Sequence, residues 1–168
     1  MFNYALTMPV GDILLKVVIE GLAAGFIAVA FAMLFSVPKR YLPYVYLGGA
    51  ITKALRTLLF TGFNMDVAIA TFIACCVSSL LFVYVAPKLG TPRPVFTVAS
   101  IIPLVPGMDA YTALLAMYKV IETGQQEISL YSYLIIEHGM RCIAILLAIC
   151  LGIAVPPLFF YRYRHGGM

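Results

Sequence analysis

Long apolar runs separated by short polar segments dominate the sequence. A helix rises about 1.5 Å per residue, so about 20 residues cross the ~30 Å hydrocarbon core of a bilayer. Three runs have that length, a fourth is broken by prolines, and the last is longer than one crossing needs. The pattern predicts an all-α integral membrane protein with about five transmembrane helices in one polytopic domain, residues 1–168. The expected spans are residues 13–35, 41–61, 66–86, 95–121 (broken) and 130–160.

The fourth apolar run is interrupted near its middle. Pro103 and Pro106 lack the N–H groups that a continuous helix needs. Gly107 permits a left-handed turn, and Asp109 is a suitable N-cap for a new helix over residues 110–121. Unpaired backbone groups in hydrocarbon cost several kcal/mol each, so a broken helix persists only where protein or a water-filled cavity satisfies them. We therefore expect a functional site at this break.

Composition narrows the class of protein. The chain is 63% hydrophobic and 11% charged, which is typical of a polytopic membrane protein. Its net charge of +4 comes from basic residues scattered between apolar runs, so nucleic acid is not an expected partner. The four cysteines lie in apolar runs without zinc or haem spacing, and we interpret them as packing residues. No metal or cofactor is expected.

The charges between the runs predict the orientation. Basic residues without acids follow the first, third and last runs, whereas acids outnumber bases in the opposite set. The positive-inside rule then places the N-terminus outside and the C-terminus in the cytoplasm, and favours five crossings over a re-entrant segment. The first dozen residues lack the basic start of a signal peptide, so the first helix should be retained. The basic set is Lys39, Arg40, Lys88, Arg93, Arg162 and Arg164, and the opposite set is Asp12, Asp66, Lys119, Glu122 and Glu127.

Small residues recur at helical spacing in the first and last runs. In lipid, such residues let helices approach closely. They predict either ordinary contacts between helices of this chain or an interface with a second chain, including a homo-oligomer. The residues are Gly21, Ala24, Gly25, Ala28 and Ala32, and then Ala144, Ala148 and Gly152.

Charged residues inside the predicted spans are candidate functional residues, because they are costly there. Lys53 and Arg56 share a face of the second span, which contains no acid, so they need anions or carbonyl groups from elsewhere. We consider both for substrate binding or translocation. Lys16 and Glu20 can pair at i,i+4, either as a structural pair or with Glu20 in proton coupling.

A second group of charges opens the last span. Glu137 can reach Arg141 at i,i+4 as a helix-surface salt bridge, and the alternative is proton coupling through Glu137 or His138. Asp109 is either only an N-cap or a carrier of the coupling proton. The positive end of a half-helix at the break, together with the cations of the second span, would favour a small carboxylate.

Several motifs resemble one known family. They are the segments Phe31–Arg40, Phe60–Asn64, Pro94–Gly107 and Ala110–Ala113. They are similar to the YjjB-type half of the threonine/serine exporter (ThrE) family, and the resemblance runs roughly from Glu20 to Arg162. The most specific part is the P-x-x-P-G block followed by Ala-Tyr-Thr-Ala.

The resemblance implies a membrane exporter of small metabolites in the bacterial inner membrane. Some members are one long chain and others are two polypeptides; this chain is similar in length to the small subunit, which works with a larger, YjjP-type subunit. The fused type implies threonine and serine as substrates, and the split type implies succinate. The matching motif positions, as candidate substrate or translocation residues, are Pro103, Pro106, Gly107, Tyr111 and Thr112.

Two functions other than transport are compared with the sequence pattern. A non-transporting scaffold that stabilises a larger subunit is the alternative, although such a scaffold has no reason to bury two cations. An enzyme is not expected, because the sequence has no HExxH, Asp-rich or G-x-S-x-G motif. No phosphate-cradling loop is present, so coupling to a proton or another gradient is expected. Five spans are few for a complete transporter, which favours a partner subunit or a homo-oligomer.

Overall fold

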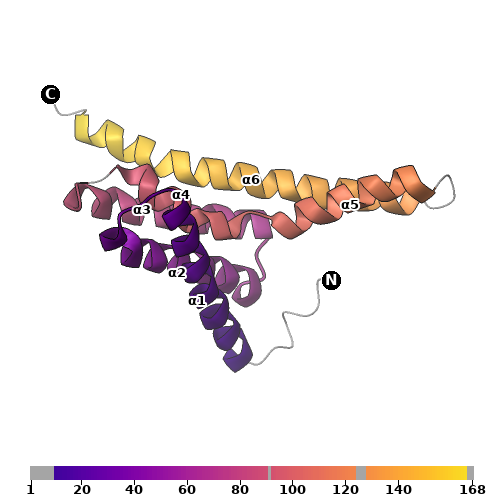
Figure 1. The fold of residues 1–168 in the computed structure, drawn as a ribbon, viewed down its shortest axis with the longest axis horizontal. Helices are drawn as coiled ribbons and strands as arrows, with labels where there is room; N and C mark the ends of the chain where they lie inside the picture. Colours follow the sequence, from indigo (N-terminus) through magenta and orange to yellow (C-terminus); the bar gives the residue numbers. More distant parts are fainter. Residues whose placement is uncertain (1–9, 91, 124–127, 166–168) are drawn as a thin grey trace. The chain divides into compact units, whose positions relative to one another are not determined.

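The computed structural model describes residues 10–90, 92–123 and 128–165 (Figure 1). Within these ranges the chain is helical and contains no strand, which confirms the predicted all-α fold. The expectation that the first helix is retained rests on the first dozen residues, of which residues 1–9 lie outside the described ranges. The loop charge of Glu127 lies outside them as well.

Six α-helices account for most of the described residues. The predicted runs are confirmed as helices, and the broken fourth run contains two of them, α4 and α5. Three short turns of other helix types complete the order: η2 (Lys39–Tyr41), the π-helical η3 (Leu58–Gly62) and η4 (Ile102–Leu104). The helices are α1 (Val10–Leu34), α2 (Leu42–Thr57), α3 (Val67–Lys88), α4 (Arg93–Ile101), α5 (Gly107–Thr123) and α6 (Ile128–His165).

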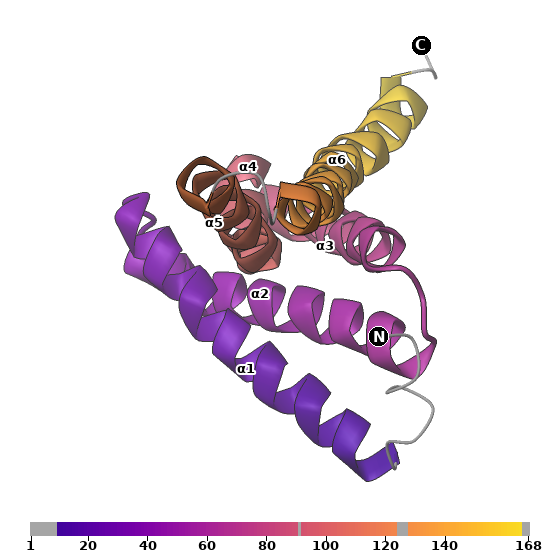
Figure 2. The ribbon, with the colours of Figure 1, turned by 90° about the vertical axis from the view of Figure 1, so that its right-hand side faces the viewer.

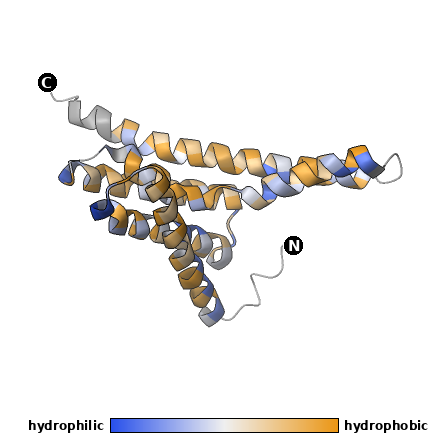
Figure 3. Ribbon diagram, viewed as in Figure 1, coloured by the Kyte–Doolittle hydropathy of each residue, from blue (hydrophilic) through white to orange (hydrophobic). Residues whose placement is uncertain are grey.

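Three helices are long and apolar enough to cross a membrane by themselves: Gly11–Leu34, Val67–Lys88 and Ile128–Phe159. A fourth span results if the helices on either side of the break count as one. Figure 3 shows the hydrophobic stretch along the middle of α6. With 16 residues, α2 is shorter than one crossing needs, so its crossing stays a prediction, as do the total of five and the orientation.

The described residues divide into two compact units, with boundaries after Leu104 and after Leu147. The first unit contains α1 to α4, η4 and the C-terminal part of α6. The second unit contains α5 and the N-terminal part of α6. The expectation of one polytopic membrane domain remains a prediction.

Small residues bring α1 against α2 in the first unit, side by side in Figure 2. Ala24, Ala28 and Ala32 are buried on one face of α1. A Cβ atom added to Gly49 of α2 would lie 2.6 Å from Ala28 Cβ, which shows how closely the two backbones approach. For the small residues of the first run, these contacts bear out the interpretation of a seam between helices of the same chain. In lipid this close packing holds helices together.

Aromatic packing fixes α4 against α2 and α3. The rings of Phe82 and Phe96 stack with their centroids 5.6 Å apart, and Tyr41 meets Phe96 edge-on at 5.5 Å. The Ser100 hydroxyl donates a hydrogen bond to the Val45 carbonyl of α2 at 3.3 Å. These contacts hold α4 so that the following turn, η4, ends beside α2.

The backbone at the break differs in detail from the prediction. Gly107 is the first residue of α5, and among the described glycines only Gly90 has a positive φ. The expected left-handed turn at Gly107 is therefore wrong. The Gly107 N–H donates to the Val105 carbonyl at 2.8 Å, which forms a tight turn without a positive φ. The Pro106 carbonyl accepts from Ala110 N–H at 3.0 Å, so α5 begins three residues before the predicted 110.

Candidate functional site

Four polar side chains from α1 and α2 form one group in the first unit, which we call the α1–α2 charge cluster: Glu20, Lys53, Arg56 and Thr57. Lys53 Nζ lies 3.5 Å from Glu20 Oε2, and the Thr57 hydroxyl donates to the same oxygen at 2.7 Å. Lys53 and Thr57 are one helical turn apart on α2, so a single carboxylate oxygen can face both of them.

A glycine next to Glu20 explains how the carboxylate reaches α2. A Cβ atom on Gly21 would lie 3.1 Å from the Ala50 carbonyl oxygen and 3.2 Å from Ala54 Cβ. There is little room for any side chain at this position. Because glycine has no side chain, α1 approaches α2 closely at Gly21, and Glu20 lies within reach of the polar face of α2.

Arg56 connects the cluster to the helix break. Its Nη1 donates to the carbonyl of Leu104 at 2.9 Å. Leu104 is buried and ends η4, where the interrupted helix leaves backbone carbonyls without their usual N–H donors. The sequence-based expectation that this arginine takes a carbonyl from elsewhere is therefore met. The end of η4 and the charged face of α2 therefore meet within the first unit.

The predicted partner of Glu20 was wrong. In the part of the chain that the structure describes, Glu20 makes its ion pair with Lys53 rather than with Lys16. The i,i+4 rule favours Lys16, but the close approach of α2 and the Thr57 hydroxyl direct the carboxylate away from the surface of α1. The same contact meets the expectation that Lys53 takes an anion from outside its own helix.

The cluster is partly shielded from its surroundings. The side chains of Lys53 and Glu20 are 25% and 33% exposed, and Thr57 is buried. Its ionisable groups are two cations and one carboxylate. Ammonium and guanidinium groups offer several N–H donors each, which suits recognition of a carboxylate by charge-assisted hydrogen bonds.

A π-helical turn, η3, follows Thr57 directly. Single π turns inside helices are rare and occur frequently at functional sites. The sequence pattern gave no sign of it, because residues 58–62 are compatible with a continuous α-helix. Thr57 itself was also missed, although its i,i+4 spacing from Lys53 could have indicated a shared face.

A second group of charged side chains joins α5 to α6 within the second unit. We call Asp109, Glu137, His138 and Arg141 the α5–α6 charge cluster. His138 Nδ1 lies 2.8 Å from Asp109 Oδ1, and Arg141 Nη1 lies 4.0 Å from the same oxygen. Arg141 Nη2 lies 3.6 Å from Glu137 Oε1, which confirms the predicted i,i+4 salt bridge.

Asp109 does not act as an N-cap. It lies inside the first turn of α5, and its side chain bonds to His138 of α6 instead. The reason is the earlier start of α5, which moves Asp109 past the capping position. The long-range contact of Asp109 with His138 was not predicted.

The other motif residues have local roles in the structure. The Thr112 hydroxyl donates to the Met108 carbonyl of its own helix at 2.8 Å, and Tyr111 is 61% exposed. Pro103 lies in η4, and buried Pro106 precedes α5. Pro103 and Pro106, with Gly107, form the break, so their substrate or translocation role stays a prediction.

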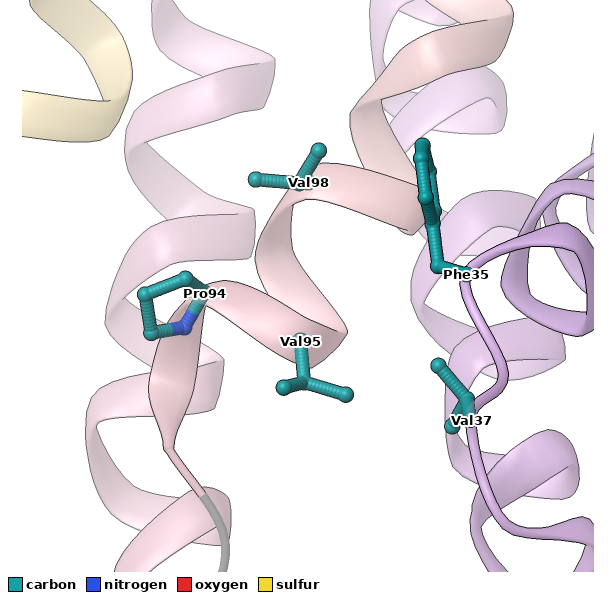
Figure 4. Close-up of a pocket in the computed structure, with 5 residues that line it drawn as sticks. All are labelled: Phe35, Val37, Pro94, Val95 and Val98. Atoms are coloured by element: carbon teal, nitrogen blue, oxygen red, sulfur yellow. The ribbon is translucent and has the colours of Figure 1, made fainter.

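One described cavity lies in the first unit and is lined by apolar side chains. It has a volume of about 260 Å³ and is lined by side chains from the end of α1 and from α4 (Figure 4). Because the lining is apolar, the cavity does not suit a carboxylate. Among the described residues, no three His, Cys, Asp or Glu side chains are placed to hold a metal ion. The cavity residues are Phe35, Val37, Pro94, Val95 and Val98.

Comparison with known proteins gives the family. The model of the family "Threonine/Serine exporter, ThrE" matches residues 20–159. The chain belongs to the threonine/serine exporter family. The match includes the break and both charge clusters, and it agrees with the apolar helices of a membrane protein.

One similar protein is an uncharacterized protein of Haemophilus influenzae, with 36% identity over 151 residues. The alignment covers 90% of this chain and 50% of that relative, so the chain spans about half the length of the curated relative that it matches. No solved structure matches this member of the exporter family.

Proposed function

We propose that this chain is a membrane subunit of a secondary exporter of small carboxylates or amino acids, rather than an enzyme. Membership of the exporter family supports transport as the activity. The observation that carries the proposal is the α1–α2 charge cluster, in which two cations and one carboxylate adjoin the end of a broken helix. Ionisable residues inside membrane proteins commonly mark substrate pathways.

Lys53 and Arg56 bind the carboxylate group that threonine, serine and succinate share. Lys53 already faces one carboxylate, that of Glu20, and Arg56 already donates to a carbonyl oxygen. A substrate carboxylate takes up further N–H donors of these two groups. When the substrate leaves, Lys53 returns to Glu20 and Arg56 returns to the Leu104 carbonyl, so both cations have partners in the empty site.

The Glu20 carboxylate favours amino acids over dicarboxylates as substrates. An amino acid carries an ammonium group, for which the Glu20 carboxylate is a suitable partner, whereas the second carboxylate of succinate would be repelled by it. Glu20→Gln should therefore reduce threonine and serine export more than succinate export. The opposite order would mean that Glu20 does not contact the amino group.

We propose a larger, YjjP-type chain as the partner subunit, in the bacterial inner membrane. The support is that this chain spans about half the length of its relative, so a second chain would supply the remaining half. Transporters are commonly built from two related or complementary bundles around a central site. A homo-oligomer is the other arrangement that would complete the pathway.

Efflux of succinate and threonine from loaded cells tests the proposal. Cells express the larger subunit alone, this chain alone, or both, and membrane abundance is measured by immunoblot. We expect efflux from both together, and a loss of at least tenfold with Arg56→Gln or Lys53→Gln. Lys39→Gln, at an exposed lysine after α1, is the matched control and should leave efflux unchanged. Normal efflux with both cations neutralised would instead support a scaffold that only stabilises the larger subunit.

A further inference from the structure

The α5–α6 charge cluster connects the first turn of α5 to α6 through a partly buried hydrogen bond. Asp109 and His138 are 21% and 23% exposed, and their bonded atoms are 2.8 Å apart. The two residues are 29 positions apart in the sequence, so the contact is made by the tertiary structure rather than by helix periodicity. Such a pair inside an apolar helical hairpin requires an explanation beyond packing.

The formal charges of the α5–α6 charge cluster sum to zero only when His138 carries a proton. Asp109 and Glu137 contribute two negative charges and Arg141 one positive charge, so the sum is −1 with a neutral imidazole. A proton on His138 brings the sum to zero. Other charges of α5, Lys119 and Glu122, lie 10 and 13 residues beyond Asp109, which is about 15–20 Å along the helix. Among the described residues, Asp109 from α5 therefore contacts His138 directly, while Arg141 of α6 reaches the same Asp109 oxygen and pairs with Glu137.

The geometry also determines where a proton enters. An ionised carboxylate only accepts hydrogen bonds, so the Nδ1 atom that faces ionised Asp109 carries hydrogen. In the neutral ring, Nε2 is then the acceptor and takes up the incoming proton. Proton uptake makes an imidazolium, so the Nδ1–H bond to ionised Asp109 then joins two opposite charges and becomes stronger. Proton release at Nε2 reverses the change.

We infer that His138 and Asp109 form the proton-binding site of the exporter, an inference that rests on the proposed function. Histidine is the side chain that ordinarily changes charge between pH 5 and 8. Because Asp109 lies in the first turn after the break, proton occupancy sets how firmly the start of α5 is held to α6. Loading and release of a proton at Nε2 thereby act on the helix that follows the break.

Everted membrane vesicles that contain this full chain and the larger subunit provide the test. Exchange of labelled threonine or succinate without a gradient measures the transport pathway, and accumulation under an imposed pH gradient measures coupling. With His138→Gln or Asp109→Asn, we expect exchange within about twofold of the unmodified rate. Accumulation should fall at least tenfold, to the level that exchange alone supports.

Matched controls use the same substitutions elsewhere. His165→Gln changes the other histidine of the sequence, and Glu122→Gln removes an exposed carboxylate of α5. Both should keep full accumulation. Accumulation that persists in His138→Gln overturns the inference alone, and so does an equal loss of exchange and accumulation. If the unmodified protein exchanges neither substrate, the proposed function fails, and the inference falls with it.

Discussion

A single methyl group added at Gly49 tests the packing on which the α1–α2 charge cluster depends. The Cβ atom of Gly49→Ala would lie 2.6 Å from Ala28 Cβ and 3.2 Å from the Ala24 carbonyl oxygen. Carbon atoms in contact are normally about 3.5–4.0 Å apart, so the shortfall is about 1 Å. Ala28 Cβ is bonded directly to the backbone of α1 and cannot rotate away. The two helices must therefore separate along this seam.

The cost of that separation follows from overpacking in other cores, which typically destabilises by about 1–3 kcal/mol. For a chain of this size, 1 kcal/mol corresponds to about 2–4 °C in Tm, so we expect a decrease of roughly 2–12 °C. The assay is thermal unfolding of the full chain in detergent with a thiol-reactive fluorophore. Cys75 is fully buried and becomes reactive on unfolding, and a background in which Cys76, Cys142 and Cys150 are replaced by alanine isolates its signal.

Two further variants make the test specific. Gly139→Ala is the matched control, because nothing lies within 4 Å of the added Cβ, and its Tm should stay the same or rise slightly. The double variant Gly49→Ala with Ala28→Gly removes the opposing methyl group, so its loss of stability should be smaller than the sum of the single losses. Equal Tm values for Gly49→Ala and Gly139→Ala would refute the reasoning, as would strict additivity in the double variant.

Two other predictions concern buried hydroxyl groups. Within the described chain, Ser78 Oγ is the buried side-chain oxygen without a hydrogen-bond partner, so Ser78→Ala should raise stability by about 1 kcal/mol. Ser79→Ala should lower stability by a similar amount, because Ser79 Oγ donates to the Ile153 carbonyl at 3.2 Å; thermal unfolding compares the two neighbours. Thr57→Val removes the donor to Glu20 and should reduce threonine exchange in vesicles several-fold, whereas Thr57→Ser keeps the donor and most of the exchange. Equal exchange by both Thr57 variants would show that this hydrogen bond does not orient Glu20.

Much of the fold could be predicted from local patterns. Apolar runs long enough for a bilayer predicted helices whose bounds lie within a few residues of those observed, and Pro103 with Pro106 located the break. The spacing of Ala24, Ala28 and Ala32 predicted a packing face, because residues four apart lie on one side of a helix. The Glu137–Arg141 pair follows from the same local rule.

By itself, then, the sequence determined the helices, the break and the choice of charged residues, since each depends on neighbours along the chain. Only the tertiary structure decided the partners that are distant in sequence, those of Glu20 and Asp109. Glu20 pairs with Lys53 because Gly21 lets α2 approach α1 closely. Lys53 then replaces Lys16, the i,i+4 neighbour, as the partner of Glu20. Asp109 bonds to His138 because α5 starts early and α6 packs beside it. A side chain reaches only a few ångströms. A charged residue therefore pairs with a partner distant in sequence where small residues or a helix break bring two backbones together.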